Sequence, residues 1–437
     1  MKRRINKVAV IGYGIMGSGI ACHFANIGVE VLLLDIVPRE LNEKEKKKGL
    51  TLEDKEVRNR LVNESLQSSL KSKPSPIYHQ KFASRIKTGN LEDDISKVSE
   101  ADWIIEVVVE RLDIKKKVFD DLEKHRKPGT LITSNTSGIP IQQMNEGRSD
   151  DFKKHFCGTH FFNPPRYLRL FEIIPGPDTS EEVLDFLNEY GEKFLGKKSV
   201  VAKDTPAFIG NRVGIFSIMS LFHMVKDMGM TIEEVDKLTG PVIGRQKSAT
   251  FRTVDVVGLD TLVHVANGLH KGVPDDEEHE LFALPDFIQT MMDNEWYGSK
   301  SGQGFYKKIK NEDGSSTIKS LDLDSLEYRD QKKASFATLE QTKTIDNVED
   351  RFEVLINGKD KAGEFYRRSF GALFAYVSHR IPEITDELYK IDDAMKAGFG
   401  WEHGPFQIWD AVGVKKGIEL IEAQGKKPAA WVNEMLE

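Results

Sequence analysis

Short apolar runs alternate with amphipathic stretches through the first two hundred positions of the chain. Runs rich in Val, Ile and Leu predict strands at 7–11, 30–35, 85–88, 103–109, 131–134, 156–160 and 170–174. Helical periodicity lies between several of these runs, as at 18–27 and 114–125. Because strands that alternate with helices usually pair in parallel, this part of the chain predicts an α/β domain with a mostly parallel sheet.

The pattern changes close to Asp204. Residues 207–228 are apolar on most faces of a helix, and few strand-like runs follow them. We therefore expect the α/β domain to span 1–204 and an all-α region to follow it. Within that region the domains are predicted as follows: a first helical domain at 205–310, a connector at 311–360 and a second helical domain at 361–437. The connector is charged and dotted with glycine and serine, which is typical of an exposed segment.

A weak internal repeat marks the C-terminal half. Two sets of residues recur in the same order, Ile232, Glu233 and Glu234 against Ile391, Asp392 and Asp393, and Phe251, Asp255 and Gly258 against Phe406, Asp410 and Gly413. The second set keeps identical spacing, so duplication explains the match better than chance. The sequence therefore predicts two similar helical units.

Composition narrows the class of protein. The chain has 437 residues, of which 39% are hydrophobic and 30% charged, which is a globular balance for two or three domains. Its net charge of -7 argues against a general nucleic-acid surface. No run approaches the roughly 20 apolar residues that cross a bilayer, so no membrane span is expected.

The cysteines and the start of the chain bear on the compartment. Cys22 and Cys157 are too few for a disulfide framework, which favours a reducing environment. The basic first residues lead into a glycine turn rather than an uninterrupted apolar segment, so secretion is not expected. We therefore predict a cytoplasmic location.

A glycine motif lies between the first predicted strand and the first predicted helix. Gly12, Gly14 and Gly17 form GxGxxG, which in this context allows a tight turn, a close approach by a pyrophosphate and close packing of helix on strand. Asp35 ends the second strand, where a carboxylate accepts hydrogen bonds from a ribose and repels a 2′-phosphate. No Arg follows at 36–37, which favours NAD over NADP. The motif by itself would also suit a flavin or a purely structural turn.

Polar residues follow several of the later strands. The segment LITSNTS at 131–137 leads from a strand into a polar turn, and His160 and Glu172 lie close to the ends of consecutive predicted strands. At the carboxyl ends of parallel strands such side chains converge on a ligand crevice. Asn211 falls in the first helix after the predicted boundary. A neutral imidazole is a suitable proton acceptor at neutral pH, so His160 is the candidate base.

These segments resemble the L-3-hydroxyacyl-CoA dehydrogenases. The similar segments are SNTS at 134–137, GTHFFNP at 158–164 with Glu172 after it, KDTPAFIGNR at 203–212, KSGQGFY at 300–306 and GPFQIWDAVG at 404–413. MGSGIA at 16–21 and LLLDIVP at 32–38 look most similar to a bacterial branch that is fused to a C-terminal enoyl-CoA hydratase domain. The resemblance implies a Rossmann-type fold, NAD as cofactor, an acyl-CoA substrate from fatty-acid β-oxidation and an enoyl-CoA hydratase as a possible partner.

The resemblance also implies roles for individual residues. His160 is expected to be the general base and Glu172 its partner, while Ser137 and Asn211 hydrogen-bond the substrate oxygen and the thioester region. Cofactor contacts are predicted at Gly12, Gly14, Ile15, Met16, Gly17, Asp35, Glu110, Lys115, Ser137 and Asn163. Two helical units in one chain suggest that the second replaces a partner subunit, so both a monomer and a homodimer stay open.

Several residues allow a simpler interpretation. Ser137 would also serve as the cap of the helix after its turn, and Asn211 as a cap or packing residue. The group His155, Cys157 and His160 alternates along a strand and does not form a convincing ligand set, so no metal site is predicted.

The basic run 44–48 belongs to a charged arm, predicted to be helical over 38–80, and is either a solvated face or a contact for the CoA phosphates. Gly138 stands where the family often has a second serine, which leaves the acyl-chain preference open. Two other functions remain in competition: a dehydrogenase of free β-hydroxy acids, and a non-catalytic NAD-binding structural protein.

Overall fold

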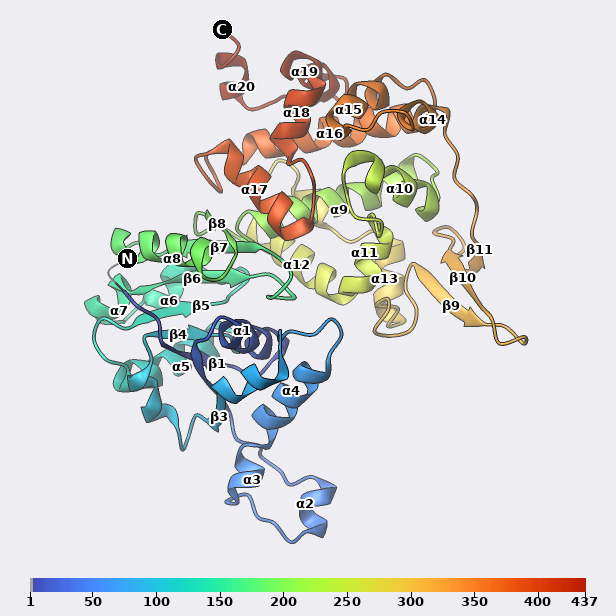
Figure 1. Cartoon of the computed structure of the whole chain (residues 1–437). Coiled ribbons are helices and arrows are strands. Elements are labelled where there is room, and N and C mark those ends of the chain that lie inside the picture. The colour runs from blue at the N-terminus through green and yellow to red at the C-terminus, as the bar shows by residue number, and fades with distance from the viewer. Residues whose placement is uncertain (1–2) are drawn as a thin grey trace. The chain divides into compact units, whose positions relative to one another are not determined.

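The computed structural model describes residues 3–437 and divides into two compact units, one ending at Phe208 and one beginning at Ile209. Figure 1 shows the strands of the first unit in blue to green and the helices of the second in green to red. The predicted fold class, an α/β part followed by a helical part, is confirmed.

The first unit is built on an eight-stranded sheet with the order β3-β2-β1-β4-β5-β6-β7-β8. The strands are β1 (Lys7–Ile11), β2 (Glu30–Asp35), β3 (Ile86–Asn90), β4 (Trp103–Glu106), β5 (Leu131–Ser134), β6 (Phe156–Phe161), β7 (Leu170–Pro175) and β8 (Lys198–Val201). All neighbours are parallel except β6 and β7. The strand order reverses beside β1, which is where ligands bind in doubly wound sheets.

Helices cover the sheet, so most of its strand residues are buried. The helices are α1 (Ile15–Asn26), α5 (Leu112–His125), α6 (Ile141–Asn145), α7 (Asp150–Lys154) and α8 (Glu181–Lys193), with short 3-10 turns η1 (Gln80–Arg85) and η2 (Ile95–Glu100). Trp103 on β4 packs edge-on against Phe24 of α1, with ring centroids 5.3 Å apart. Strands that are buried in this way read as continuous apolar runs, which is why the sequence located β1 to β7. The four-residue β8, with only two apolar residues, was not predicted.

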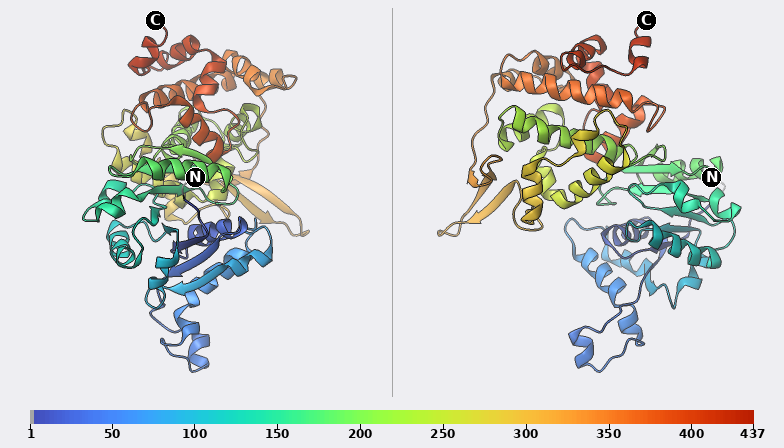
Figure 2. Two further views of the ribbon diagram at one scale, coloured as in Figure 1. Left: turned by 60° about the vertical axis from the view of Figure 1, so that its left-hand side comes forward. Right: turned by 180° about the vertical axis from the view of Figure 1, so that it is seen from behind.

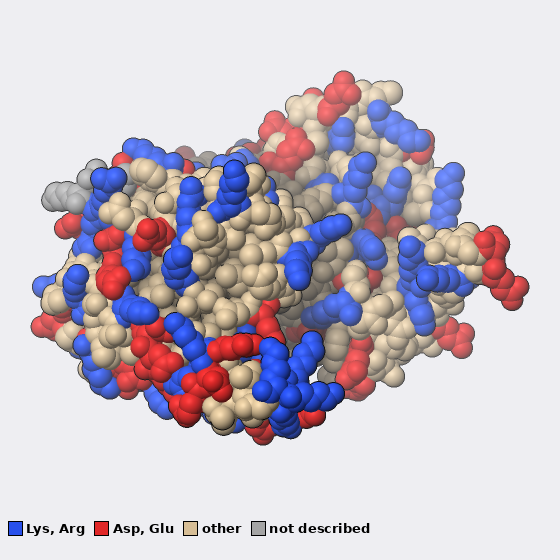
Figure 3. Space-filling view, turned by 60° about the horizontal axis from the view of Figure 1, so that its bottom comes forward, with Lys and Arg blue, Asp and Glu red and all other residues tan. Residues whose placement is uncertain are grey.

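The predicted helical arm consists of α2 (Glu43–Lys47), α3 (Lys55–Arg58) and α4 (Arg60–Lys71). Val62 and Leu66 of α4 join the core around α1, whereas α2 and α3 extend away from the sheet (Figures 1 and 2). Arg60 pairs with the buried Glu45 at 2.8 Å and so ties α2 to α4. Figure 3 brings the face of this end forward and shows Lys and Arg side chains beside Asp and Glu rather than a surface of one sign.

The second unit is mainly helical. Its helices are α9 (Gly210–Asp227), α10 (Ile232–Leu238), α11 (Phe251–Val257), α12 (Leu259–Gly272), α13 (Asp286–Asp293), α14 (Ala337–Thr342), α15 (Val348–Asn357), α16 (Lys361–His379), α17 (Leu388–Phe399), α18 (Pro405–Val412), α19 (Val414–Glu422) and α20 (Ala430–Glu434), with 3-10 turns η3 (Pro241–Ile243) and η4 (His279–Phe282). Among residues 3–437 no helix combines the length and the apolar character needed to span a membrane.

Two glycine positions show the duplication in the second unit. Gly258 separates α11 from α12 with φ 106°, and Gly413 separates α18 from α19 with φ 93°. Gly244 and Gly400 are left-handed, both with φ 67°. The helices α9 to α12 and α16 to α19 therefore follow the same course.

The structure aligns the first set of repeated residues differently from the sequence prediction. A carboxylate oxygen of Asp236 accepts from the backbone N–H of Phe251 at 2.7 Å, and Asp392 does the same for Phe406 at 2.8 Å. Asp392 is therefore equivalent to Asp236 and not to Glu233. The sequence match aligned acidic residues by type alone, whereas the hydrogen bond aligns the two carboxylates by the helix N-terminus that they bind.

Two parts of the second unit differ from the expected all-α region and connector. Strands β9 (Tyr306–Lys310), β10 (Ser316–Leu321) and β11 (Tyr328–Asp330) form an antiparallel sheet, in which the β9–β10 hairpin extends away from the helices (Figures 1 and 2). Further along, Phe352 of α15 packs against Phe370 of α16, with centroids 5.7 Å apart. Residues 348–357 are therefore part of the second helical unit, because their apolar face is buried there.

Candidate active site

The glycine turn after β1 is as tightly built as its motif suggests. Gly12 has φ 123°, and a Cβ atom there would lie 2.4 Å from the carbonyl oxygen of Val107. A Cβ atom on Gly17 would lie 1.9 Å from the carbonyl oxygen of Gly12. At Gly14, by contrast, a Cβ atom would meet no atom within 4 Å. Gly12 and Gly17 are thus required by packing, and Gly14 leaves open space where a pyrophosphate would approach.

The first turn of α1 borders this open space. Gly14 is the N-cap of α1, with no side-chain cap, and the helix begins at Ile15, which is 75% exposed. The first N–H groups of a helix have no intrahelical partner, so those of Ile15 and Met16 can donate to an anion. Both residues were predicted to contact the cofactor, and their position is compatible with that role.

Asp35 connects the end of β2 to the glycine turn. Its carboxylate accepts from the backbone N–H of Tyr13 at 2.5 Å and from that of Ile36 at 2.6 Å. Burial raises the pKa of Asp35, and these two hydrogen bonds oppose the rise. An ionised carboxylate has about four acceptor positions, so two stay free for the hydroxyls of a ribose.

A buried ion-pair network lies beyond the end of β4. The Nζ atom of Lys115 is 2.8 Å from Glu106 and 3.2 Å from Glu110. The side chains of Lys115 and Glu106 are only 1% and 0% exposed. Lys115 therefore contacts Glu110 from the buried side. Burial opposes the charge on Lys115, but the two carboxylates outweigh it and raise its pKa. Burial likewise opposes the charge on Glu110, but Lys115 and the hydrogen bonds hold its pKa low.

Glu110 in turn holds the polar turn that follows β5. Its Oε1 atom accepts from the hydroxyl of Thr136 at 2.6 Å and from the backbone N–H of Ser137 at 2.8 Å. Glu106 accepts from the hydroxyl of Ser134 at 2.5 Å. Glu106 was not predicted from the sequence, although a carboxylate that ends an otherwise apolar strand indicates such a role.

His160 and Glu172 are directly opposite each other in the β6–β7 pair. The Nδ1 atom of His160 is 2.7 Å from a carboxylate oxygen of Glu172, and the side chains are only 6% and 0% exposed. Because a carboxylate accepts, this contact places the ring proton on Nδ1 and leaves Nε2 as the basic nitrogen.

The route by which the pair is brought together differs from the prediction. The two residues were expected near the carboxyl ends of parallel strands, but β7 runs antiparallel to β6 and Glu172 is near its start. The return through residues 162–169 makes them cross-strand neighbours instead. Asn135 stabilises the end of β6, because its side chain accepts from the backbone N–H of Phe161 at 2.9 Å.

The ring of His160 lies among aromatic side chains. Its centroid is 4.6 Å from that of Phe162 and 5.7 Å from that of Phe208. Phe162 and Phe208 are themselves buried. This apolar surrounding limits the positions of the imidazole and leaves its hydrogen bond to Glu172 as the fixed contact.

The helix cap considered for Ser137 is wrong. The first N–H groups of α6, at Ile141 and Gln142, donate to the carboxylate of Asp204 at 3.0 and 3.1 Å. Ser137 is exposed, and within residues 3–437 no group hydrogen-bonds to its hydroxyl. A substrate or cofactor atom therefore has access to this hydroxyl.

Two further residues, Asn163 and Asn211, were predicted to belong to the site. Asn163 is exposed just beyond the end of β6. Asn211 is half-buried in the first turn of α9 and belongs to the second unit. The role of each stays a prediction.

Comparison with known families agrees with this arrangement. Residues 7–205 match the NAD binding domain of 3-hydroxyacyl-CoA dehydrogenase, and residues 208–308 match the C-terminal domain of the same enzyme. The chain belongs to the 3-hydroxyacyl-CoA dehydrogenase family. The glycine turn, Asp35 and the His160–Glu172 pair all fall within the part that matches the NAD binding domain.

Similar proteins match this chain over different shares of its length. A probable 3-hydroxyacyl-CoA dehydrogenase of Bacillus subtilis is 49% identical over all of this chain, which spans 55% of that protein. A probable 3-hydroxyacyl-CoA dehydrogenase of Deinococcus radiodurans is 44% identical over 71% of this chain and 84% of its own length. The 3-hydroxybutyryl-CoA dehydrogenase of Escherichia coli K12 has the same fold, with a TM-score of 0.70, 21% identity and coverage of 99% and 98% of the two chains.

Proposed function

We propose that this protein oxidises L-3-hydroxyacyl-CoA to 3-ketoacyl-CoA with NAD, as part of fatty-acid β-oxidation. The observation that carries the proposal is the buried hydrogen bond between His160 and Glu172, on a sheet whose β1 leads into the glycine turn. Membership of the family supports the same reaction. The chain spans about half of the Bacillus subtilis relative, so the proposal concerns the reaction of this chain alone.

His160 acts as the base in this reaction. Its Nε2 atom takes the proton of the 3-hydroxyl while the C3–H bond breaks with its electron pair and the C3–O double bond forms. NAD, when bound, supplies the acceptor for that hydride. The negative charge of Glu172 stabilises the imidazolium that results and keeps the ring in the correct tautomer.

Ser137 and Asn211 are proposed to hold the substrate. A hydroxyl and an amide at the reacting oxygen and the thioester would stabilise charge that develops on oxygen in the reverse direction. Glu110 fixes the backbone of Ser137, so the Lys115 network sets where that hydroxyl lies.

The residues present fit NAD. Gly14 leaves room for the pyrophosphate beside the open N-terminus of α1, and Asp35 offers acceptors for ribose hydroxyls. A 2′-phosphate next to the Asp35 carboxylate would be repelled, which supports NAD rather than NADP. Glu110 is the proposed contributor on the nicotinamide side, with the buried Lys115 acting through its ion pair to Glu110, and Asn163 remains a proposed cofactor contact.

An enoyl-CoA hydratase is the proposed partner, fused or separate. Hydration of a 2-enoyl thioester produces the 3-hydroxyl that this reaction consumes, and the Bacillus subtilis relative is long enough to hold further domains. A cytoplasmic location and the choice between monomer and homodimer stay predictions.

The proposal is tested by reduction of acetoacetyl-CoA. We expect the purified chain to consume NADH, followed by its absorbance, only when the CoA ester is present. NADPH and free acetoacetate are the controls for the cofactor and for the thioester. Bound NADH without turnover of either substrate would contradict the proposal and favour a non-catalytic protein, while turnover of acetoacetate would favour a free-acid dehydrogenase.

A further inference from the structure

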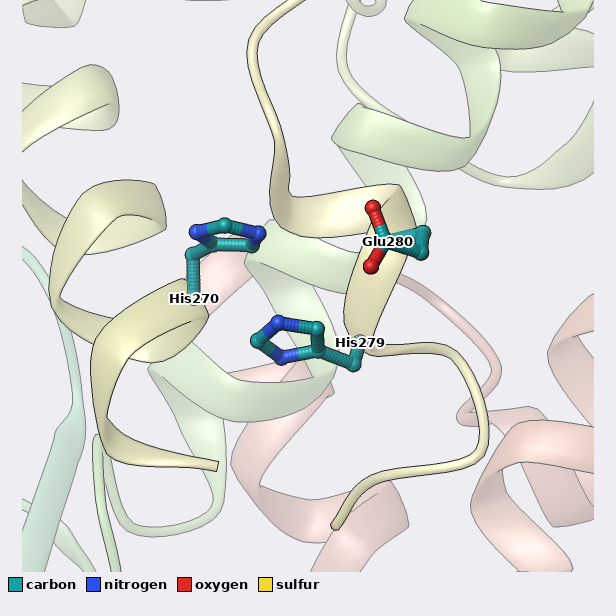
Figure 4. A group of neighbouring side chains, drawn as sticks. All are labelled: His270, His279 and Glu280. Carbon is teal, nitrogen blue, oxygen red and sulfur yellow. The ribbon is translucent and has the colours of Figure 1, made fainter. Parts of the chain in front are cut away.

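We propose that His270, His279 and Glu280 form a binding site for a divalent transition metal ion of the zinc type. The three side chains come from the end of α12 and from η4, on either side of a short loop. Figure 4 shows the Glu280 carboxylate turned toward the two imidazole rings. One ligand atom from each residue lies within 4.8 Å of the others. These residues were not predicted from the sequence, because the loop separates them.

The hydrogen bonding of His279 prepares it for a metal. Its Nδ1 atom is 3.2 Å from the carbonyl oxygen of Val273, which can only accept. The ring proton therefore belongs on Nδ1, and Nε2 keeps its lone pair for coordination. Histidines that bind metals almost always have such an outer contact to a carbonyl or a carboxylate.

The other two ligands are free to move into place. The side chains of His270 and Glu280 make no hydrogen bond or ion pair within the part of the chain that the structure describes. The rings of His270 and His279 stack with centroids 4.2 Å apart and planes 16° apart. Since a metal lies in the plane of each ring that binds it, coordination requires His270 to turn about its side-chain bonds. The ligand atoms then approach to ~3.4 Å, the separation in a tetrahedral site with bonds of about 2.1 Å.

The donor set determines the class of ion. Two imidazole nitrogens and one carboxylate oxygen suit Zn²⁺ and its neighbours Co²⁺ and Ni²⁺, whereas Mg²⁺ and Ca²⁺ prefer oxygen alone. Three protein ligands leave one position for water. Asp275, in the same loop, is exposed and adds negative charge nearby.

A bound ion would tie down the loop that carries Asp276. The side chain of Asp276 is fully buried and accepts from Arg212 at 2.5 Å, from the hydroxyl of Tyr376 at 3.1 Å and from Arg380. It thus links α9 of the first helical repeat to α16 and Arg380 of the second. Closing the loop at His270 and His279 would hold Asp276 in this position, so the ion should stabilise the second unit.

The test uses the whole chain after removal of metal with a chelator and dialysis. We expect calorimetric titration with Zn²⁺ to show one site, and Co²⁺ to give the visible absorption of a low-coordinate nitrogen and oxygen site. His270→Gln and His279→Gln should each weaken Zn²⁺ binding by about 10–100-fold or more. The matched control is His264→Gln, an exposed histidine on the same helix, which should bind as the parent does.

The melting temperature gives a second readout. Zn²⁺ should raise it in the parent chain and in His264→Gln but not in His270→Gln, because an ion that binds only the folded state shifts unfolding. The proposal is overturned if the parent chain shows no stoichiometric site, or if Co²⁺ keeps the weak spectrum of the hydrated ion. It is also overturned if His264→Gln loses as much affinity as His270→Gln. The measurements on the parent chain hold even if a variant fails to fold.

Discussion

Glu172 lies directly across the β6–β7 pair from His160, and the two side chains share a buried hydrogen bond of 2.7 Å. Each residue is fixed by its own strand, so the distance between them depends on the register of the pair. A shift of β7 by one residue would turn Glu172 to the opposite face of the sheet from His160. The antiparallel pairing of these two strands is therefore what creates the proposed base.

We expect His160→Gln to lower kcat for acetoacetyl-CoA reduction by roughly 10²–10⁴-fold, the usual range for a positioned general base. NADH binding, measured by fluorescence titration, should be unchanged because the glycine turn is intact. Turnover close to that of the parent chain would remove His160 from the mechanism.

Glu172→Gln should also lower kcat, since the amide cannot stabilise an imidazolium and can favour the wrong tautomer. The double variant with His160→Gln is expected to be no slower than His160→Gln alone, because the two residues act as one unit. Multiplicative losses in the double variant would show that Glu172 acts independently of His160.

Asp35→Ala should weaken NAD binding and reduce the preference for NAD over NADP, because the ribose contact and the repulsion are lost together. Burial raises the pKa of Asp35, so acidification protonates it at a higher pH than an ordinary aspartate. NAD affinity should therefore fall as the pH drops through that raised pKa. Asp35→Asn serves as the control and should lose this pH dependence; an unchanged profile would mean that another group causes it.

The glycines of the turn should respond differently to alanine. Gly17→Ala places a Cβ atom against the carbonyl of Gly12 and should lower the free energy of unfolding. Gly14→Ala meets no protein atom, so it should keep the stability of the fold and weaken NAD binding. Urea unfolding and NAD titration on both variants separate the two effects. Equal loss of stability in both would contradict the roles assigned here.

Lys115→Met should destabilise the first unit by about 3–5 kcal/mol, because it leaves the buried Glu106 without its counter-charge. The free energy of urea unfolding measures this loss. Lys124→Met is the control on the same helix, since its pair with Asp121 is exposed and should contribute within about 1 kcal/mol. A loss no larger than that of the control would show that the network is not a stabilising one.

The sequence by itself determined seven of the eight strands of the sheet, the glycine turn and the identity of the candidate base, whereas β8 was not predicted. Strands buried on both faces are long apolar runs, and the turn requires glycine at Gly12 and Gly17 for local steric reasons. These signals are local, so they survive without any knowledge of the fold. The family resemblance of the segment around His160 depends on the same local residues.

Only the tertiary structure decided which distant residues meet. The antiparallel return of β7, the Asp204 cap on α6 and the Glu106–Lys115 pair all join positions that have no shared local pattern. The β9–β11 sheet escaped prediction because its exposed strands carry few apolar residues. Strand pairing and burial between remote segments, not local preference, place these groups. The sequence therefore identified His160 and Glu172 as candidates, but only the fold determined how they contact each other.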